Sequence, residues 1–334
     1  SILEDIGTEL EDRSKNSKTH VKEGDYLSEE VIKNWQLGID FGTSNTRIAI
    51  KSPDHSDPVV LNLGNNKSMP SAISYHIDTE NNKVAIQSIG QTALDNGVGA
   101  NTVLITDLKK YILNEEYSNE NHSLENPGWW IGGDQVQLGS SVFSFKDIAH
   151  QFLDHVLETA VHQIQNAIEE ELLDLDGCVI TRNNITQFKV KFGIPVRVSR
   201  ATREFYLDLG KSLGFDNIEL SDLQEEPSLS LKPFINLKEI PSASKVLIYD
   251  LGGGTFDIAI VEINDKGEAI ILAQDGELFG GTYIDECFLK FIVGKISKEM
   301  KMDADMVWEY LKDDKFEQYN LKRSCVTVKE TLSD

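Results

Sequence analysis

The sequence predicts an α/β protein that is divided into at least two units. Residues 37–50 and 246–260 each show an apolar run, a glycine-bearing turn and a second apolar run, which is the pattern of two strands joined by a tight turn. A long amphipathic helix is expected between these stretches. With 334 residues, of which 40% are hydrophobic, the chain is too long for one compact core and has ample apolar side chains for more.

Both strand–turn–strand stretches carry an aspartate just before the turn. Asp40 comes two residues before Gly42, and Asp250 comes two residues before the run 252–255, which reads Gly-Gly-Gly-Thr. A glycine turn lets backbone N–H groups approach a phosphate closely, and an aspartate can hold a hydrated metal ion. Two such turns in one chain predict a clamp that binds a nucleotide from both sides.

The remaining elements follow from hydrophobic spacing and turn residues. Residues 1–36 are polar and acidic, and we expect an extension with a short helix capped by Ser28. Residues 53–58 should form a turn. The other expected strands are 59–63, 69–75, 128–131, 135–138 and 188–196. The expected helices are 106–113, 147–173, 199–213, 303–311 and 315–330, with one more that follows 274–285 and runs toward residue 296.

The tripeptide Gly210-Lys211-Ser212 resembles the end of a nucleotide-binding P-loop. Phe205 stands where that motif needs a glycine, and the tripeptide lies inside the helix expected at 199–213, which should end at Gly214. We therefore reject a P-loop. The sequence also contains no GxGxxG fingerprint of dinucleotide binding.

Charge and cysteine content exclude several classes of protein. The chain has 32 Lys and Arg against 55 Asp and Glu, a net charge of −23, and such an acidic surface repels the phosphate backbone of nucleic acids. Cys178, Cys287 and Cys325 are widely spaced, which argues against a zinc site or a disulfide framework and predicts a reducing, cytoplasmic location. No apolar run approaches the length of a membrane span, so no membrane partner is expected.

Several segments together resemble the 70-kDa heat-shock protein family, the DnaK-type chaperones, within the actin-like ATPase superfamily. They follow the family's order and are 38–43 (GIDFGT), 69–71 (MPS), 101–103 (NTV), 108–112 (LKKYI), 194–196 (IPV), 201–203 (ATR), 225–228 (EEPS), 249–257 (YDLGGGTFD), 279–281 (FGG) and 329–333 (KETLS). The most specific is 249–257, which is nearly the family's second phosphate loop.

The resemblance implies a two-lobed actin-like ATPase fold with ATP in the cleft between the lobes. Each lobe would be ribonuclease-H-like, with a mixed sheet flanked by helices. Residues 1–36 would be a polar N-terminal extension, 37–232 the first lobe with an inserted subdomain at about 65–145, and 233–334 a partial second lobe. We expect the chain to be a piece of a longer protein that continues into a peptide-binding domain.

The resemblance also implies a role for each site residue. Asp40 and Asp250 would hold a hydrated Mg²⁺ ion, Glu226 would orient the attacking water, and Lys109 would lie against the γ-phosphate. Asp257 would complete the network around metal and water. The residues expected to hold ATP or ADP are Gly42, Thr43, Ser44, Asn45, Gly252, Gly253, Gly254, Thr255, Gly280, Gly281, Lys329 and Ser333.

Two of these roles have competitors next to them in the chain. The spacing from the segment 101–103 to Lys109 is about two residues longer than the family pattern, so Lys110 is an alternative. Glu225 likewise competes with Glu226.

The helix expected to grip adenine departs from the family pattern. Lys329 and Ser333 match it, whereas Val326 and Glu330 do not. Adenine would therefore be held more weakly or in another way.

The expected function is the ATP-hydrolysing part of a heat-shock-70-like chaperone, in which the nucleotide state controls lobe closure. The expected partners are a J-domain cochaperone, a nucleotide-exchange factor and unfolded polypeptide clients, which would act through a missing C-terminal domain. The alternatives are a filament-forming ATPase of the actin or MreB kind, a sugar or acid kinase on the same fold, and a nucleotide-sensing module with little turnover.

Overall fold

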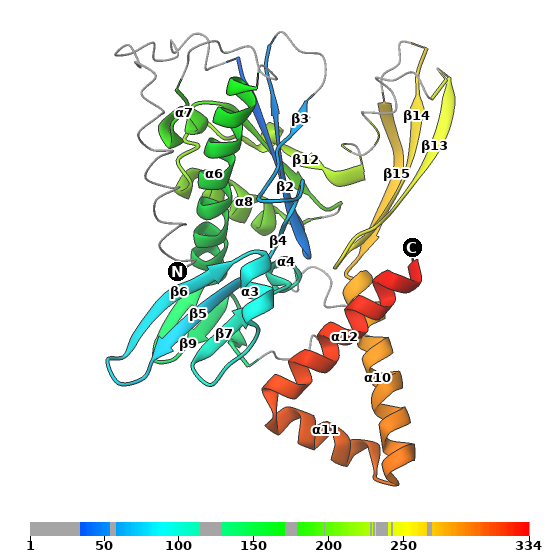
Figure 1. Cartoon of the computed structure of the whole chain (residues 1–334). Helices are drawn as coiled ribbons and strands as arrows, with labels where there is room; N and C mark the ends of the chain where they lie inside the picture. Colours follow the sequence, from blue (N-terminus) through cyan, green and yellow to red (C-terminus); the bar gives the residue numbers. More distant parts are fainter. Residues whose placement is uncertain are drawn as a thin grey trace.

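The chain is a mixed α/β protein built in two halves (Figure 1). The computed structural model describes residues 34–53, 58–113, 128–170, 179–196, 198–227, 229, 231, 240, 241, 243–265 and 269–333. The described strands form one six-stranded sheet and three sheets of three strands each. The helix expected at Ser28 and most of the turn expected at 53–58 lie outside the described residues.

The six-stranded sheet is the centre of the first half. Its strands are β1 (Gln36–Phe41), β2 (Asn45–Lys51), β3 (Val59–Val60), β4 (Met69–Pro70), β11 (Lys189–Ile194) and β12 (Leu223–Glu225). The strands β12, β11 and β1 run parallel, whereas β2 is antiparallel to β1. Leu37, Ile39 and Phe41 alternate along β1 and are buried, because every second side chain of a strand points to the same face.

Helices α6 (Phe145–Glu169), α7 (Arg182–Thr186) and α8 (Arg200–Ser212) lie beside this sheet (Figure 1). Helix α6 begins two residues earlier than predicted, because Ser144 and Asp147 form a capping box that satisfies the first free N–H groups. It ends at Glu169, and residues 171–173 of the predicted helix lie outside the described part. Helix α8 lies within the helix predicted at 199–213, and Ser199 is its N-cap.

Two small antiparallel sheets lie next to the first half. One contains β5 (Ile73–Asp78), β6 (Lys83–Ile89) and β7 (Thr102–Ile105), and the other β8 (Trp130–Gly132), β9 (Gln135–Leu138) and β10 (Ser141–Ser144). Two short helices, α3 (Gln91–Asn96) and α4 (Leu108–Ile112), belong to the same region.

The single strand predicted at 69–75 is wrong. The segment divides into β4, which pairs with β2, and β5, which belongs to another sheet. Ser71 lies between them, and its backbone N–H and its hydroxyl both donate to the turn after β1. These bonds hold Ser71 out of any strand, and a local sequence pattern cannot reveal them.

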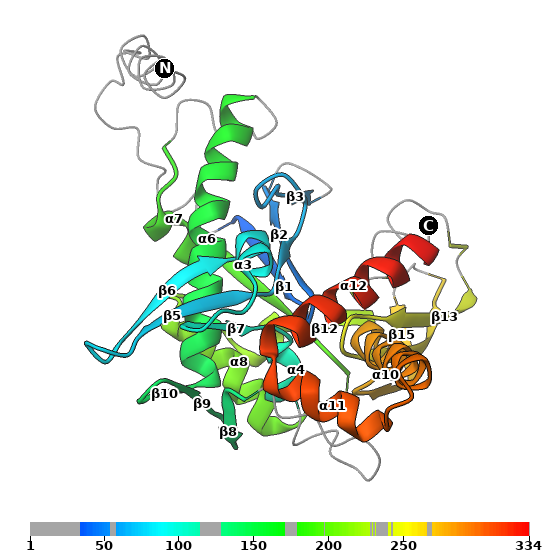
Figure 2. The same ribbon diagram turned by 60° about the horizontal axis from the view of Figure 1, so that its bottom comes forward.

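The described part of the second half consists of a three-stranded antiparallel sheet and three helices. The strands are β13 (Ser244–Leu251), β14 (Phe256–Ile263) and β15 (Ala269–Glu277), and the helices are α10 (Gly281–Met300), α11 (Ala304–Asp313) and α12 (Lys315–Ser333). The sheet and the helices each have a small apolar cluster of their own. Figures 1 and 2 show α12 extending from the region of α3 and α4 toward the sheet β13–β15.

Asp222 stabilises the start of β12, the strand that precedes Glu226. It ends a 3₁₀ turn (Leu220–Asp222), and its carboxylate accepts hydrogen bonds from Lys191 Nζ at 2.7 Å and from the Glu219 backbone N–H at 2.9 Å. Burial alone would raise the pKa of Asp222, but these hydrogen bonds outweigh burial and lower it.

We therefore expect Asp222→Asn to lower the free energy of unfolding by about 2 kcal/mol near neutral pH. The pKa of Asp222 is lower in the folded chain than in the unfolded chain, so its stabilisation is present above the ordinary value of 3.8 and is lost as the pH falls below it. Urea unfolding at about pH 7 and about pH 3 should show a smaller difference between variant and parent in acid. The exposed Asp216→Asn serves as control, and an equal difference at both pH values would contradict the assignment.

No helix among the described residues is both long enough and apolar enough to cross a membrane.

Candidate functional site

The two glycine turns have the same construction. In the first hairpin Asp40 pairs in register with Arg47, and the Gly42 N–H donates to Asn45 O at 3.1 Å. In the second hairpin Asp250 pairs in register with Asp257, and the Gly252 N–H donates to Thr255 O at 2.8 Å. Each hairpin therefore has a pair of facing residues next to its turn. Three of these four residues are aspartates, and the fourth is Arg47.

The two turns meet at the centre of the molecule. Gly253 lies against Ser44, and a Cβ atom added to Gly254 would come within 2.5 Å of Thr43 Oγ1. A side chain at either glycine would therefore collide with the opposite turn. A phosphate group can enter between the two tips only if the halves move apart.

Each turn is held by a neighbouring segment. The Ser71 hydroxyl donates to Gly42 O at 2.8 Å, and the Ser71 N–H donates to Ser44 O at 2.9 Å. On the other side, the Gly281 N–H donates to Gly252 O at 2.9 Å and the Thr282 N–H to Gly253 O at 2.8 Å. These bonds use the carbonyl groups of the turns and orient their backbone.

A buried ion pair joins two segments that are far apart in the sequence. Lys109 Nζ, on α4, lies 2.6 Å from Glu226 Oε1, and the Lys109 side chain is only 2% exposed. Burial opposes the charged form of the lysine, but its interactions with Glu226, Tyr206 and Asp40 outweigh burial and raise its pKa. Lys109 therefore remains a charged ammonium group and binds the carboxylate of Glu226, which was predicted to be a site residue.

The aspartates of both hairpins surround this ion pair. The pKa of Asp40 and that of Asp250 are raised, mainly by partial burial, while Lys109 and Arg47 act on both in the opposite direction. Burial and then the charge of Glu226 raise the pKa of Asp257 to about 6, although the Val196 N–H donates to its Oδ1 at 3.2 Å. The site gathers more negative than positive charge and therefore favours a cation.

The donor set fits magnesium. The described residues contain no cluster of three or more His, Cys, Asp or Glu side chains close enough to hold a metal ion by themselves. Mg²⁺ keeps several of its waters and usually takes one or two protein carboxylates together with phosphate oxygens of the substrate. Asp40 and Asp250, one from each hairpin, match that requirement.

The structure separates the competing residues. Lys110 Nζ points away from Glu226 to Glu286 Oε1 on α10, at 3.1 Å. Glu225 accepts from Arg203 on α8, at 3.2 Å. Lys109 and Glu226 are therefore the pair that lies beside the aspartates.

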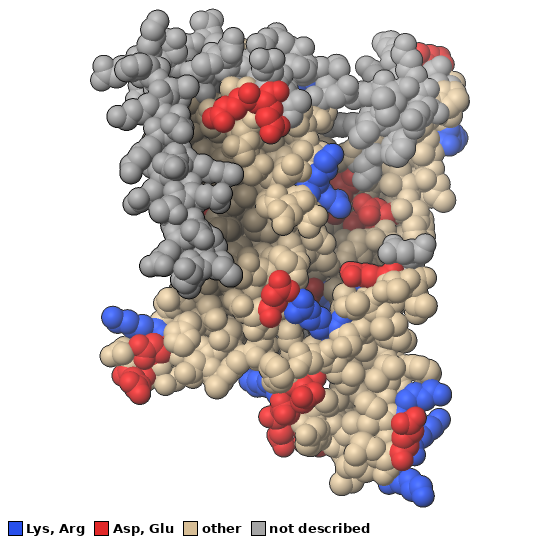
Figure 3. Space-filling view, viewed as in Figure 1, with Lys and Arg blue, Asp and Glu red and all other residues tan. Residues whose placement is uncertain are grey.

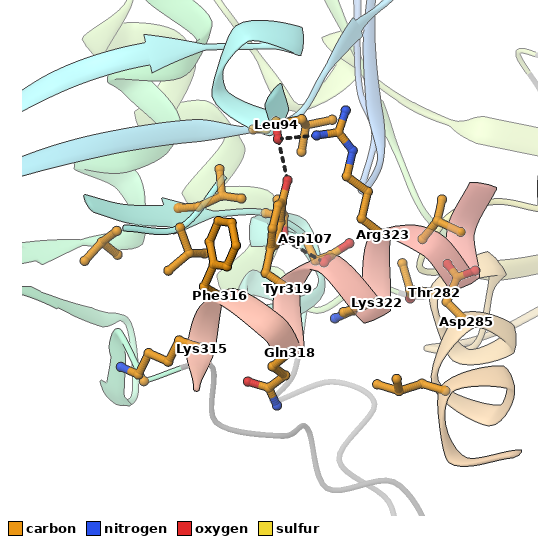
Figure 4. Close-up of a pocket in the computed structure, with 18 of the residues that line it drawn as sticks. Leu94, Asp107, Thr282, Asp285, Lys315, Phe316, Gln318, Tyr319, Lys322 and Arg323 are labelled. Atoms are coloured by element: carbon orange, nitrogen blue, oxygen red, sulfur yellow. Dashed lines mark hydrogen bonds between the residues drawn. The ribbon is translucent and has the colours of Figure 1, made fainter. Parts of the chain in front are cut away.

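A cleft of about 1810 Å³ opens between the first half and helices α10–α12. Thr43, Ser44 and Asn45 line one end of it, and Lys329 lies in its wall. Acidic and basic side chains lie next to each other in the hollow between the two halves (Figure 3). At the far end, Tyr319 Oη donates to Leu94 O at 2.5 Å, as Figure 4 shows.

The residues expected to hold adenine belong to α12. Lys329 Nζ donates to Gly281 O at 3.3 Å and is paired with Asp285, so it contacts the segment behind the second turn. Val326 and Glu330, which depart from the family pattern, line the cleft. The side chain of Ser333 lies outside the described part of the chain.

Most of the predicted site residues lie together, whereas Asn45 and Lys329 line the adjoining cleft and the side chain of Ser333 lies outside the described residues. Those that the structure brings together are Asp40, Gly42, Thr43, Ser44, Lys109, Glu226, Asp250, Gly252, Gly253, Gly254, Thr255, Asp257, Gly280 and Gly281. Sequence reasoning missed Arg47, which faces Asp40. Its position across the first turn was the available signal, since residues on both sides of a tight hairpin turn pair in register.

The comparisons with known proteins cover most of the chain. A model of the Hsp70 protein family matches residues 235–334. The chaperone protein DnaK of Mycoplasmopsis agalactiae is 24% identical over 279 residues, which are 83% of this chain and 38% of that protein. The chaperone protein DnaK of Mycoplasma mobile is 24% identical over 298 residues, which are 89% of this chain and 40% of that protein. The chain thus spans about two fifths of the length of these curated relatives.

Proposed function

We propose that this chain, which is a distant member of the Hsp70 family, binds ATP with Mg²⁺ between its two halves and hydrolyses it. One observation carries the proposal. Four carboxylates and a buried lysine from distant segments converge beside two facing glycine turns, and the five residues are Asp40, Lys109, Glu226, Asp250 and Asp257. Phosphoryl transfer is catalysed mainly by positioning and electrostatics, which this set of groups can supply.

The turns would hold the phosphates of ATP. Their backbone N–H groups and the hydroxyls of Thr43 and Thr255 would be the donors, and once the halves move apart the absence of side chains at Gly253 and Gly254 would allow close approach. Asp40 and Asp250 would hold the magnesium ion through water molecules. When bound, this ion neutralises phosphate charge and polarises the phosphoryl oxygens.

The buried ion pair would position the attacking water. Glu226 would accept a hydrogen bond from that water, and Lys109, which lies 2.6 Å from Glu226 Oε1, would hold this carboxylate in place and offset negative charge during transfer. A pKa raised to about 6 makes Asp257 a stronger base than an ordinary aspartate, so its carboxylate is suited to take up the water proton.

In the complete protein, we propose an actin-like two-lobed fold whose closure follows the nucleotide state. Contacts between the halves support such coupling, since Lys110 pairs with Glu286, and Arg323 on α12 pairs with Asp95 at 2.6 Å. For the complete protein we propose the role of a cytoplasmic chaperone that works with a J-domain cochaperone, an exchange factor and unfolded clients. The names of the two relatives, both chaperone protein DnaK, support the chaperone part of this proposal.

Asp250→Asn tests the proposed site. We expect ATP turnover to fall by at least about a hundredfold, because one of the two metal-holding carboxylates loses its charge, while the circular dichroism spectrum stays unchanged. Asp265→Asn, at the other end of the same hairpin, is the matched control and should keep normal turnover. Unchanged hydrolysis by Asp250→Asn would remove the metal assignment.

A nucleotide-sensing module with little turnover is the second candidate. Val326 and Glu330, which line the cleft but depart from the family's adenine-binding pattern, favour it. Single-turnover hydrolysis with excess protein distinguishes the two functions, because a sensor would retain intact ATP. ATP-dependent sedimentation would instead indicate a filament-forming ATPase.

A further inference from the structure

Arg47 occupies a special position in the first hairpin. It pairs in register with Asp40, just as Asp257 pairs with Asp250 in the second hairpin. The two turns share one hydrogen-bond pattern, so Arg47 and Asp257 stand at equivalent positions on opposite sides of the same site. One hairpin thus contributes a cation where the other contributes an anion.

The guanidinium group of Arg47 is directed toward the carboxylates. Its Nη1 lies 3.9 Å from Asp40 Oδ2, and its charge acts on the pKa of both Asp40 and Asp250. Arg47 therefore interacts with the acidic side chains of both halves, although it belongs to only one of them.

The contact with Asp40 uses little of the hydrogen-bonding capacity of the Arg47 guanidinium group. A distance of 3.9 Å is too long for a hydrogen bond, and the side chains of Arg47 and Asp40 are 61% and 47% exposed. Exposed ion pairs of this kind contribute little to stability, so stability does not account for an arginine here. Arginine is the residue best suited to bind phosphate oxygens with two parallel hydrogen bonds.

The charge balance of the site explains why a cation is useful at this position. Among the described residues, two cations, Lys109 and Arg47, act on Asp40, Glu226, Asp250 and Asp257, which leaves a formal charge of −2 for this set. A triphosphate is itself strongly anionic, and an additional negative charge at the site would oppose its binding. Lys109 is committed to Glu226, whereas Arg47 can turn toward a ligand.

We propose that Arg47 is a phosphate-binding residue that holds the terminal phosphates of the nucleotide and supplements the charge of the metal ion. This inference rests on the proposed function, since it assigns one more residue to the same ATP site. It predicts that nucleotide affinity depends on Arg47 both with magnesium and without it.

The experiment is a calorimetric titration of the intact protein with ATP, ADP and adenosine, each with magnesium and with EDTA. We expect Arg47→Gln to weaken ATP binding by about tenfold to hundredfold in both conditions, since charge-assisted hydrogen bonds to phosphate are lost. ADP should lose less, and adenosine should be unaffected. Arg47→Lys keeps the charge and should recover part of the affinity.

Lys51→Gln is the matched control, because it removes one positive charge from the same strand four residues away and should leave ATP binding unchanged. Thermal unfolding without ligand checks that Arg47→Gln folds normally. ATP binding by Arg47→Gln within about twofold of the parent would overturn this inference alone. An equal loss for adenosine would also overturn it, and failure of the parent to bind ATP would overturn the proposed function as well.

Discussion

Replacing Lys109 by methionine is expected to lower ATP turnover by about a thousandfold. The substitution keeps the length of the side chain but removes the charge that lies 2.6 Å from Glu226 Oε1. Without the lysine charge, repulsion from Asp40, Asp250 and Asp257 would displace the Glu226 carboxylate from the attacking water. We also expect the free energy of unfolding to fall by about 3 kcal/mol, as for other broken buried ion pairs.

Two further variants make this prediction specific. Lys110→Met removes a charge from the neighbouring residue, which pairs with Glu286, and should reduce turnover by less than about tenfold. In the double variant Lys109→Met/Glu226→Gln, stability should partly return because no buried charge is left unpaired, while turnover stays low. Steady-state hydrolysis and urea unfolding give both quantities. A turnover close to that of the parent in Lys109→Met would reject Lys109 as a catalytic residue.

Gly280→Ala is expected to lower the free energy of unfolding by about 2–3 kcal/mol and to abolish tight ATP binding. A Cβ atom at this position would lie 2.6 Å from Gly252 O and 2.7 Å from Gly253 O. Both contacts are with backbone, which cannot yield without breaking the hydrogen bonds that Gly281 and Thr282 donate to the same carbonyl groups. The second phosphate turn would therefore be displaced.

Gly294→Ala provides the control for this substitution. Gly294 lies inside α10, and an added Cβ would meet nothing within 4 Å. Alanine is the better helix former, so this variant should gain about 0.5–1 kcal/mol of stability. Urea unfolding and ATP titration of both variants provide the comparison. Normal ATP binding by Gly280→Ala would show that the position of the second turn does not matter for the site.

Local elements could be read from the sequence because their causes are local. The turn at Gly42 and the helix α8 after Ser199 each depend on neighbouring residues, and the structure has both. The rejection of a P-loop at 210–212 is confirmed, since these residues lie inside α8. The strand predicted at 69–75 failed because Ser71 is bound to the first turn, 29 residues earlier in the chain.

The choice between adjacent candidates needed the tertiary structure. Lys109 and Lys110 are consecutive on a helix of five residues, and only the placement of α4 decides which ammonium group reaches Glu226. Glu225 and Glu226 are distinguished in the same way, because Arg203 on α8 binds Glu225. The catalytic and binding roles assigned to these residues stay predictions that the variants above test.

The sequence by itself determined two hairpins with glycine turns, their aspartates and the family to which the chain is related, because each depends on residues that are close along the chain. Only the tertiary structure decided which charges share a site, since electrostatic energy depends on distance and burial and the partners Lys109 and Glu226 are 117 residues apart. The same reason explains why the role of Arg47 could not be predicted from the sequence. Its pairing with Asp40 is local, but its influence on Asp250 exists only because the second hairpin folds against the first.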